Sequence, residues 1–465
     1  MKIALYMTGS FAKVLRRFAD YLPNIELSAA CTSWQAYEET LKEPRIQAVD
    51  YLYQDFNALF DQVDVAAFCA KYAEINLYEV MQVDKAHFKK KPGNYQLRYI
   101  CAMGEQIARF FEKTRPDYVF FPIIETNDAM MAYRLAQHFG IRPIINSHGR
   151  FANLWFFSDS HRELLPAYLD AVDKPESDQA CAIDFLEKYR ANPGPFNYRA
   201  DFPGGEVYPD FGEETTAFQR LIRNIRLKFG QERHNCMISL WIRFQVHFQH
   251  LFLPVRNFMF RMNERFCIRP QPAPEGDYDF FPLHFSPESS INVPAPFYID
   301  QIRVVDKILL EREGNRTLVV KEHPAMFGFR EKGFYRTLKR RPFVSFVHRT
   351  IKSYDLIRKA NTVFSVTGTA CLEAFFFGVK WVQLGDNYLS DWVHRRQAKG
   401  AEATPVEFIR DVRSVSSDFV LYSPGRCLAD DRILFARKNI EKLCAHLEFH
   451  IRHDQAFRAK NGLQE

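Results

Sequence analysis

The chain has 465 residues, of which 47% are hydrophobic, and a formal net charge of +6 at pH 7. This length exceeds what one hydrophobic core usually serves, so we expect two or three domains. No run of about 18 uncharged apolar residues occurs, so no transmembrane helix is expected. The nine cysteines include no CxxC pair, which argues against a zinc or thioredoxin-type site and favours a cytoplasmic protein with free thiols.

The first part of the chain alternates apolar runs with segments of helical spacing. The N-terminal run is interpreted as a first strand and not as a signal peptide. The run Asp117–Ile124 is apolar throughout, which is typical of a strand buried on both faces. This alternation of strands and helices predicts a parallel, Rossmann-like sheet. The predicted strands are 2–7, 117–124 and 141–149, and the predicted helices are 11–22 and 129–140, the second with Gly140 as its C-cap.

The middle of the chain is less regular. From about Phe156 to Phe211, Pro, Gly and Asp become frequent, which predicts an irregular connection with one helix near Gln179–Tyr189. Residues 218–269 have strong helical spacing broken by Gly230 and Pro254, and 268–279 form a linker. The strand–helix rhythm then resumes. The predicted strands are 279–285, 317–323, 343–347, 362–366 and 380–385, and the predicted helices are 300–312, 332–340, 354–360, 369–377 and 430–453.

Two Rossmann-like halves predict an α/β, GT-B-like architecture with an interdomain cleft, a helical basic insertion and a long C-terminal helix. The alternative is two unrelated α/β domains. The expected domains are an N-terminal Rossmann-like acceptor-side domain (1–205), a basic helical segment with linker (206–275), a C-terminal Rossmann-like nucleotide-sugar-binding domain (276–430) and a C-terminal helix (431–465).

The loop after the predicted strand 362–366 carries groups that suit a nucleotide. Ser365, Thr367 and Thr369 supply hydroxyls, and Gly368 allows a tight turn before a helix. Free amides and the dipole at a helix N-terminus favour an anion. Glu373, one turn into the helix, can accept hydrogen bonds from ribose hydroxyls. In the alternative interpretation a threonine only caps the helix and Glu373 complements its dipole.

Two neighbouring loops could line the same crevice. The strand 317–323 brings Lys321 and His323 to its carboxyl end, where a histidine can donate to a leaving phosphate and a lysine adds positive charge. An isolated histidine in such a turn is the alternative. The loop after strand 279–285 adds His284, Glu288 and Ser289 as candidate donor-site residues.

In the first domain, Glu125 and Asp128 follow a buried strand. A carboxylate at that edge could act as a general base or a nucleophile towards the acceptor. Helix capping by Asn127 or Asp128 is the alternative for those two residues. Further candidates for the acceptor or cleft follow other strands: Ser10, His148 and Arg150.

Two other features of the sequence bear on metal binding and on membrane binding. Asp277 and Asp279 form a DxD pattern, but they lie in a linker, so we expect no metal site and no cofactor besides a nucleotide sugar as substrate. Between Phe218 and Pro270 there are ten Lys or Arg against two Glu. The aromatic and basic segment Arg220–Arg269 could lie on an anionic membrane surface or pack against the domains. No recognisable motif accompanies the charge, so nucleic acid is not an expected partner.

Together these residues resemble the bacterial capsular polysaccharide biosynthesis proteins, a group that includes Kdo transferases. The resemblance rests on FPLHFSPESS with the following DQ, KEHP and SVTGTACLEAFFFGVKWVQLG, with weaker support from PDYVFFPIIETND and AYRLAQHFGIRPIINSHGR. It implies a metal-independent GT-B type glycosyltransferase. By position it implies that His323 contacts the donor phosphate, that Ser365 to Thr369 hold phosphate or nucleotide, that Glu373 holds the ribose, and that Glu125 or Asp128 is the reacting carboxylate.

The expected function is transfer of a sugar from a nucleotide-activated donor, such as a CMP-linked acidic sugar like Kdo, to a bacterial surface polysaccharide or glycolipid. The expected place is the cytoplasm or the inner face of the cytoplasmic membrane. Two enzyme alternatives are a sugar-nucleotide 2-epimerase and a CDP-glycerol-type polyol-phosphate transferase. The non-enzyme alternative is a capsule-assembly scaffold or glycan-binding protein.

Overall fold

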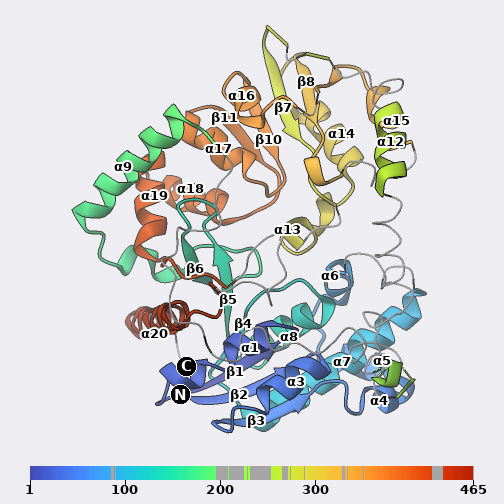
Figure 1. The fold of residues 1–465 in the computed structure, drawn as a ribbon, viewed down its shortest axis with the longest axis vertical. Coiled ribbons are helices and arrows are strands. Elements are labelled where there is room, and N and C mark those ends of the chain that lie inside the picture. The colour runs from blue at the N-terminus through green and yellow to red at the C-terminus, as the bar shows by residue number, and fades with distance from the viewer. Residues whose placement is uncertain are drawn as a thin grey trace. The chain divides into compact units, whose positions relative to one another are not determined.

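The computed structural model describes residues 1–84, 88, 91–194, 208, 222, 225–227, 229–230, 253–263, 271–272, 274–286, 289–326, 330–331, 333–348, 350–421 and 433–463. The chain forms two compact α/β units (Figure 1). The first unit contains the described residues of Met1–Ala182, Pro195–Ser239 and Glu407–Glu465. The second contains those of Ile183–Gly194 and Leu240–Val406.

The first unit is built on a six-stranded sheet of order β3-β2-β1-β4-β5-β6. All neighbouring strands are parallel except β5 and β6, which are antiparallel. The first five strands thus have the 3-2-1-4-5 order of a Rossmann-like sheet. The predicted strands at 2–7, 117–124 and 141–149 are confirmed. The strands are β1 (Lys2–Met7), β2 (Glu26–Cys31), β3 (Ile46–Tyr51), β4 (Tyr118–Phe121), β5 (Arg142–His148) and β6 (Trp155–Ser158).

Among the helices of the first unit, one predicted helix end is confirmed and one predicted helix is wrong. Gly140 follows the end of α8 with a φ of +69°, as expected of a residue beyond a helix C-cap. The single helix predicted over 11–22 is wrong, because Arg17 N–H bonds to Val14 O and this tight turn ends α1. The helices are α1 (Phe11–Leu15), α2 (Phe18–Tyr21), α3 (Trp34–Thr40), α4 (Phe56–Gln62), α5 (Val65–Lys71), α6 (Leu77–Gln82), α7 (Gly93–Thr114), α8 (Asn127–His138), η2 (Ala167–Ala171), α19 (Pro405–Ser414) and α20 (Arg437–Lys460).

The end of the chain packs into the core of the first unit. Ile440, Leu443 and Leu447 of α20 belong to the same buried cluster as Ile3 and Leu5 of β1. The side chain of Asn439 donates to Val420 O and accepts from Val420 N–H, at 2.8 and 2.7 Å. Apolar burial and these bonds place Glu407–Glu465 in the first unit. The predicted boundaries instead gave residues up to 430 to the second domain and treated 431–465 separately.

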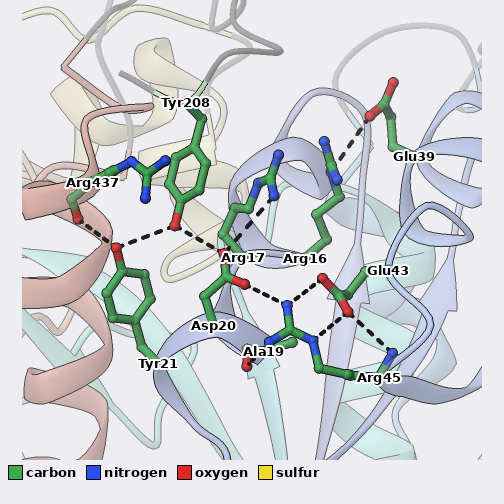
Figure 2. A network of polar contacts seen from close by, with 10 residues as sticks. All are labelled: Arg16, Arg17, Ala19, Asp20, Tyr21, Glu39, Glu43, Arg45, Tyr208 and Arg437. Carbon is green, nitrogen blue, oxygen red and sulfur yellow. Dashed lines mark hydrogen bonds and ion pairs between the residues drawn. The ribbon is translucent and has the colours of Figure 1, made fainter. Parts of the chain in front are cut away.

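A polar network also joins the two ends of the chain in the first unit (Figure 2). The ring of Tyr208 lies between the guanidinium groups of Arg17 and Arg437, at 4.3 and 4.9 Å from its centre. The Tyr208 hydroxyl donates to Asp20 Oδ2 at 3.0 Å, and Tyr21 donates to the backbone carbonyl of Arg437 at 3.3 Å. These contacts therefore connect α2 and the residue before it to the start of α20.

The second unit is built on a five-stranded parallel sheet of order β11-β10-β7-β8-β9. Its order is again 3-2-1-4-5, so the chain contains two Rossmann-like sheets, as expected of a GT-B-like protein. All five predicted strands of this half are confirmed: β7 (Tyr278–Pro282), β8 (Thr317–Lys321), β9 (Val344–Phe346), β10 (Thr362–Ser365) and β11 (Lys380–Gln383).

Helices cover both faces of the second sheet, with separate apolar clusters on each face. One cluster joins the sheet to α14 and α15, and the other joins it to α16 and α17. None of the described helices is both long and apolar enough to cross a bilayer. The helices are α9 (Glu176–Ala191), whose last residues belong here, α12 (Leu253–Asn263), α13 (Ser289–Asn292), η5 (Pro296–Tyr298), α14 (Gln301–Glu311), η6 (Pro324–Met326), α15 (Phe334–Lys339), α16 (Ser353–Ile357), α17 (Ala370–Phe377) and α18 (Tyr388–Ala398).

Candidate functional site

The strand order locates a candidate site in the second unit. The chain builds the sheet outward in one direction from β7 and in the other direction from β10, which are neighbours. Open α/β sheets bind ligands outside the carboxyl ends of their strands at such a switch point. The loops at this edge are those that the sequence singled out, after β7, β8 and β10. We call their described residues, with α17, the donor edge.

His284 braces three loops of the donor edge. Its Nε2 atom accepts a hydrogen bond from Val366 N–H at 3.1 Å and lies 3.2 Å from Ser365 Oγ. Its backbone N–H donates to Gln301 Oε1 at 3.1 Å, and its carbonyl accepts from Arg330 Nη2 at 2.6 Å. His284 is buried. The ring was expected to line the donor site, and the structure gives it a positioning role within the edge.

Gly368 is required by the close approach of the His284 ring. A Cβ atom built on Gly368 would lie 2.7 Å from His284 Cε1, closer than real Cβ contacts come, and 3.0 Å from Ser365 Oγ. Gly368 N–H donates to Ser365 Oγ at 3.1 Å. The sequence predicted a glycine turn here, and the structure adds the reason why no larger side chain fits.

The three hydroxyl groups of the loop make internal bonds. Ser365 and Thr367 are buried, and Thr367 Oγ1 donates to Ser290 O at 2.5 Å. Thr369 is the N-cap of α17 but makes no side-chain capping bond, and its hydroxyl donates instead to Glu373 Oε1 at 3.1 Å. The capping alternative is therefore wrong for Thr369. An anion at this loop would meet the backbone amides at the start of α17.

Two titratable groups of the donor edge interact electrostatically: Lys321, which is buried, and Glu373, which is half-buried. Burial raises the pKa of Glu373 to about 7, although the hydrogen bond from Thr369 and the charge of Lys321 oppose the shift. Burial also lowers the pKa of Lys321, against the attraction of Glu373. Lys321 Nζ donates to Ser353 Oγ at 3.0 Å, and among the described residues no ion pair within 4 Å joins the two groups. With a pKa of about 7, the Glu373 carboxyl can change its protonation near neutral pH.

An ion-pair network that the sequence did not indicate lies beside Lys321. Glu322 accepts two bonds from Arg330, from Nε at 3.0 Å and from Nη2 at 2.9 Å, and one from the Tyr335 hydroxyl at 2.6 Å. Glu322 and Arg330 are both buried. A glutamate that directly follows a buried strand is the one sequence signal that could have pointed to this network, since buried carboxylates are paired.

The remaining donor candidates differ in how much the structure says of them. His323 is exposed, and its ring lies 5.9 Å from the ring of Phe285. Its backbone N–H donates to Glu322 Oε1 at 2.6 Å. Glu288 lies outside the described residues, and the same holds for the side chain of Ser289, the first residue of α13. Their predicted roles stay predictions.

The corresponding edge of the first unit lies at β1 and β4, and we call it the acceptor edge. Asp128 is buried and accepts a hydrogen bond from the Tyr6 hydroxyl at 2.7 Å. The N-cap of α8 is Thr126, whose hydroxyl accepts from Ala129 N–H at 3.4 Å. Capping by Asp128 is therefore wrong, as it is for its neighbour Asn127. Glu125 is half-buried in the loop before the cap.

The other acceptor-edge candidates follow β1 and β5. Ser10 is half-buried and precedes α1 without a side-chain capping bond. His148 Nδ1 accepts from Arg150 N–H at 2.6 Å, and burial lowers the pKa of His148 to about 3. The guanidinium of Arg150 pairs with Glu163 at 3.1 Å. The φ angles of Arg150, Ala152 and Asn153 are all positive, a conformation that costs free energy for residues other than glycine.

The DxD pattern has a structural explanation in this fold. Asp279 lies fully buried in β7 and forms ion pairs with Arg312 at 3.5 Å and Arg316 at 3.3 Å. Asp277 is exposed before the strand. Among the described residues, no three His, Cys, Asp or Glu side chains are grouped as metal ligands. Two arginines thus account for the burial of Asp279.

Comparisons with known proteins find likeness in structure and not in sequence. No family model and no curated protein matches the chain. Among solved structures, KpsC of Thermosulfurimonas dismutans matches twice. Its β-Kdo 2,4-transferase is 11% identical with a TM-score of 0.36, over 64% of this chain and 79% of its own. Its β-Kdo 2,7-transferase is 11% identical with a TM-score of 0.37, over 95% and 99%.

The UDP-GlcNAc 2-epimerase of Methanocaldococcus jannaschii, solved in complex with UDP-GlcNAc and UDP, also matches. It is 13% identical with a TM-score of 0.24, over 97% of this chain and 100% of its own. Identities and TM-scores this low carry no argument about activity. The fold assignment rests on the order and direction of the strands in the two sheets.

Proposed function

We propose that this protein is an enzyme of nucleotide-sugar chemistry, and specifically a GT-B type glycosyltransferase. The observation that carries the proposal is the donor edge: a switch point braced by His284 and Gly368, with Lys321 and Glu373 beside the start of α17. A ligand with a phosphate and a ribose has matching partners there, because helix amides and a lysine favour the anion and a carboxyl group accepts from hydroxyls.

In the proposed reaction, the glycosidic bond between the sugar and its nucleotide phosphate breaks as the acceptor hydroxyl attacks the sugar. Negative charge develops on the leaving phosphate. The amides of α17, the ammonium of Lys321 and the exposed ring of His323 would stabilise that charge. We propose a CMP-linked acidic sugar such as Kdo as the donor and a bacterial surface polysaccharide or glycolipid as the acceptor, on the sequence resemblance.

The acceptor hydroxyl must lose a proton in this reaction, and we propose a carboxylate of the acceptor edge as the base. Glu125 is the better candidate of the two, because its side chain is only half-buried, whereas Asp128 is buried. Glu125→Gln should then reduce kcat by at least about 100-fold, while Asp128→Asn has the smaller effect on kcat. The opposite ranking would give the role to Asp128.

Calorimetric titration with CMP, CDP, UDP and GDP tests the donor edge directly. We expect one nucleotide class to bind, and Gly368→Ala to weaken that binding about 100-fold because the new Cβ displaces His284. Gly276→Ala is the matched control, since a Cβ there meets nothing within 4 Å. Binding of none of the nucleotides would overturn the proposal.

Turnover assays separate the transferase from the epimerase alternative. The bound nucleotide's sugar derivatives are incubated with and without acceptor, and products are followed by mass spectrometry and NMR. A transferase forms product only with acceptor, and His323→Ala and Glu373→Ala should abolish that product while leaving the fold intact. An isomerised nucleotide sugar formed without acceptor would identify an epimerase.

A further inference from the structure

The exposed apolar side chains of this protein are concentrated in its basic segment. Of the fifteen large apolar side chains that are exposed among the described residues, seven lie between residues 222 and 262. The structure describes few residues of that segment, so these seven exposed side chains are a large share of the described ones. Contiguous exposed apolar surface on a water-soluble domain marks a place where another surface binds.

Helix α12 presents these side chains as one stripe. Val255, Phe258, Met259 and Met262 are exposed by 53%, 63%, 65% and 42%. Their spacing of three, one and three residues places them on one face of a helix. Arg261, next to the stripe in sequence, is exposed as well. The stripe is therefore both apolar and flanked by positive charge.

A second apolar group occurs earlier in the same basic segment. Ile222, Ile225 and Phe229 are exposed, and Arg226 is exposed among them. Gly230, directly after this group, accepts a hydrogen bond from Asn57 Nδ2 at 2.5 Å. This group thus belongs to the first unit, whereas α12 belongs to the second. The same combination of apolar and basic side chains is present on each unit.

We propose that α12 docks on an anionic lipid bilayer, with its apolar stripe inserted at the level of the headgroups. Three observations favour lipid over a protein partner. The apolar groups are short, they recur along the chain, and they belong to a stretch of sequence with ten Lys or Arg against two Glu. A bilayer surface binds such scattered groups without a matched pocket, through apolar burial and attraction to acidic headgroups.

The exposure of Phe258 also bears on the alternative in which the aromatic residues of this segment pack against the domains. Phe258 is 63% exposed, so most of its surface is not packed against the described residues of either unit. The proposed lipid surface uses none of the donor-edge residues, so it does not depend on the proposed reaction. It would bring a glycosyltransferase to a lipid-linked acceptor.

Vesicle sedimentation tests the proposal on the full chain. We expect binding to vesicles of phosphatidylcholine with phosphatidylglycerol, much weaker binding to phosphatidylcholine alone, and loss of binding as salt is raised. The double variant Phe258→Gln with Met259→Gln should lower the partition coefficient about tenfold, because two apolar side chains no longer insert. Arg261→Gln should lower it by a smaller factor.

The matched control is the double variant Phe297→Gln with Leu310→Gln. These side chains are 86% and 84% exposed in the second unit but lie outside the basic segment. The control should bind vesicles like the wild type, and both double variants should keep the far-UV circular dichroism and nucleotide binding of the wild type. Failure to bind either vesicle, equal binding to both vesicles, or an equal loss in the control would overturn the proposal.

Discussion

The donor edge and the acceptor edge have the same strand order but are held together differently. At the donor edge, His284 and the Glu322–Arg330 pair connect the loops after β7, β8 and β10. At the acceptor edge, one bond between Tyr6 and Asp128 joins β1 to α8, and the loop after β5 carries three residues with positive φ. One edge is braced by side chains that join three loops, and the other carries a strained loop.

This difference shows that strand topology fixes where a ligand edge lies and not how its loops are held together. A braced edge suits a ligand part that is the same in every turnover, because preorganised groups cost no reorganisation when the charge develops. The bracing of the donor edge agrees with the donor role that we propose.

The largest effect is expected from breaking the brace of the donor edge. Glu322→Ala leaves the buried guanidinium of Arg330 without a carboxylate and removes the acceptor of the Tyr335 hydroxyl. We expect a loss of about 3–5 kcal/mol in the free energy of unfolding. Urea unfolding measures it, with Glu331→Ala, an exposed neighbour, as the control. A loss no greater than in the control would show that the edge does not depend on this pair.

The next effect is a contrast in pH dependence between the two edges. Burial raises the pKa of Glu373 to about 7 from 4.5, so the folded state holds a proton that the unfolded state lacks between those pH values. This contribution to stability is present below pH 4.5 and is lost as pH rises towards 7. At the acceptor edge, burial lowers the pKa of His148 to about 3 from 6.5. Its contribution is present above pH 6.5 and is lost as pH falls towards 3.

Acidification from pH 7 to 5 should therefore stabilise the donor edge by about 2 kcal/mol and destabilise the acceptor edge by a similar amount, a relative change of about 4 kcal/mol. The buried His446 and His450 of α20, with pKa values lowered to about 4 and about 3, act in the same direction as His148 in the first unit. Hydrogen exchange of peptides from β10 and β1, corrected for intrinsic rates, measures the difference. Glu373→Gln should remove the donor-edge part, and an unchanged profile in that variant would contradict the assignment.

A smaller effect is expected from removing the bond between Tyr6 and Asp128 at the acceptor edge. Tyr6→Phe deletes the hydroxyl that donates to the buried Asp128 carboxylate. We expect a loss of about 1.5 kcal/mol in the free energy of unfolding. Urea unfolding measures this loss, and the double variant with Asp128→Asn gives the coupling energy of the pair. Additive losses in that cycle would mean that the bond contributes nothing of its own.

The smallest effect concerns the strained loop after β5. Ala152 has a φ of +48°, which glycine adopts without a steric cost. Ala152→Gly should raise the free energy of unfolding by about 0.5 kcal/mol, the relieved strain being partly offset by the greater entropy of the unfolded chain. Ala129→Gly, in the first turn of α8, should instead lower it by about 1 kcal/mol. Loss of stability in both variants would show that the loop is not strained.

Much of the fold could be predicted from the sequence because buried parallel strands are continuous apolar runs, as in β4 and β7. β2 and β3 were not identified individually, since Glu26–Cys31 and Ile46–Tyr51 mix polar and apolar residues. The packing of α20 against β1 also escaped prediction. It depends on contacts between residues more than 400 positions apart, which no local pattern records.

For the candidate site, the sequence located the loops but not the directions of their side chains. His284 turns inward because its acceptor nitrogen meets the amide of Val366, 82 positions later in the chain. The internal bonds of Ser365 and Thr367 arise in the same way, from loops that meet only after the strands pair. Arg330 could not be assigned, because its bond to the carbonyl of His284 joins two loops that are 46 positions apart in the chain.

The placement of α20 in the first unit has a consequence for synthesis of the protein. The second unit, Ile183–Gly194 with Leu240–Val406, is complete in sequence before the ribosome has made α20. Until then, β1 and Phe157 lack the helix that covers them in the finished core. Domains usually become complete from the N-terminus onward during translation. Here the second unit, which is encoded later, can fold before the first unit is complete. Until α20 has been made, the apolar residues of the first sheet that α20 covers stay exposed. Exposed apolar surface of this kind is what chaperones bind.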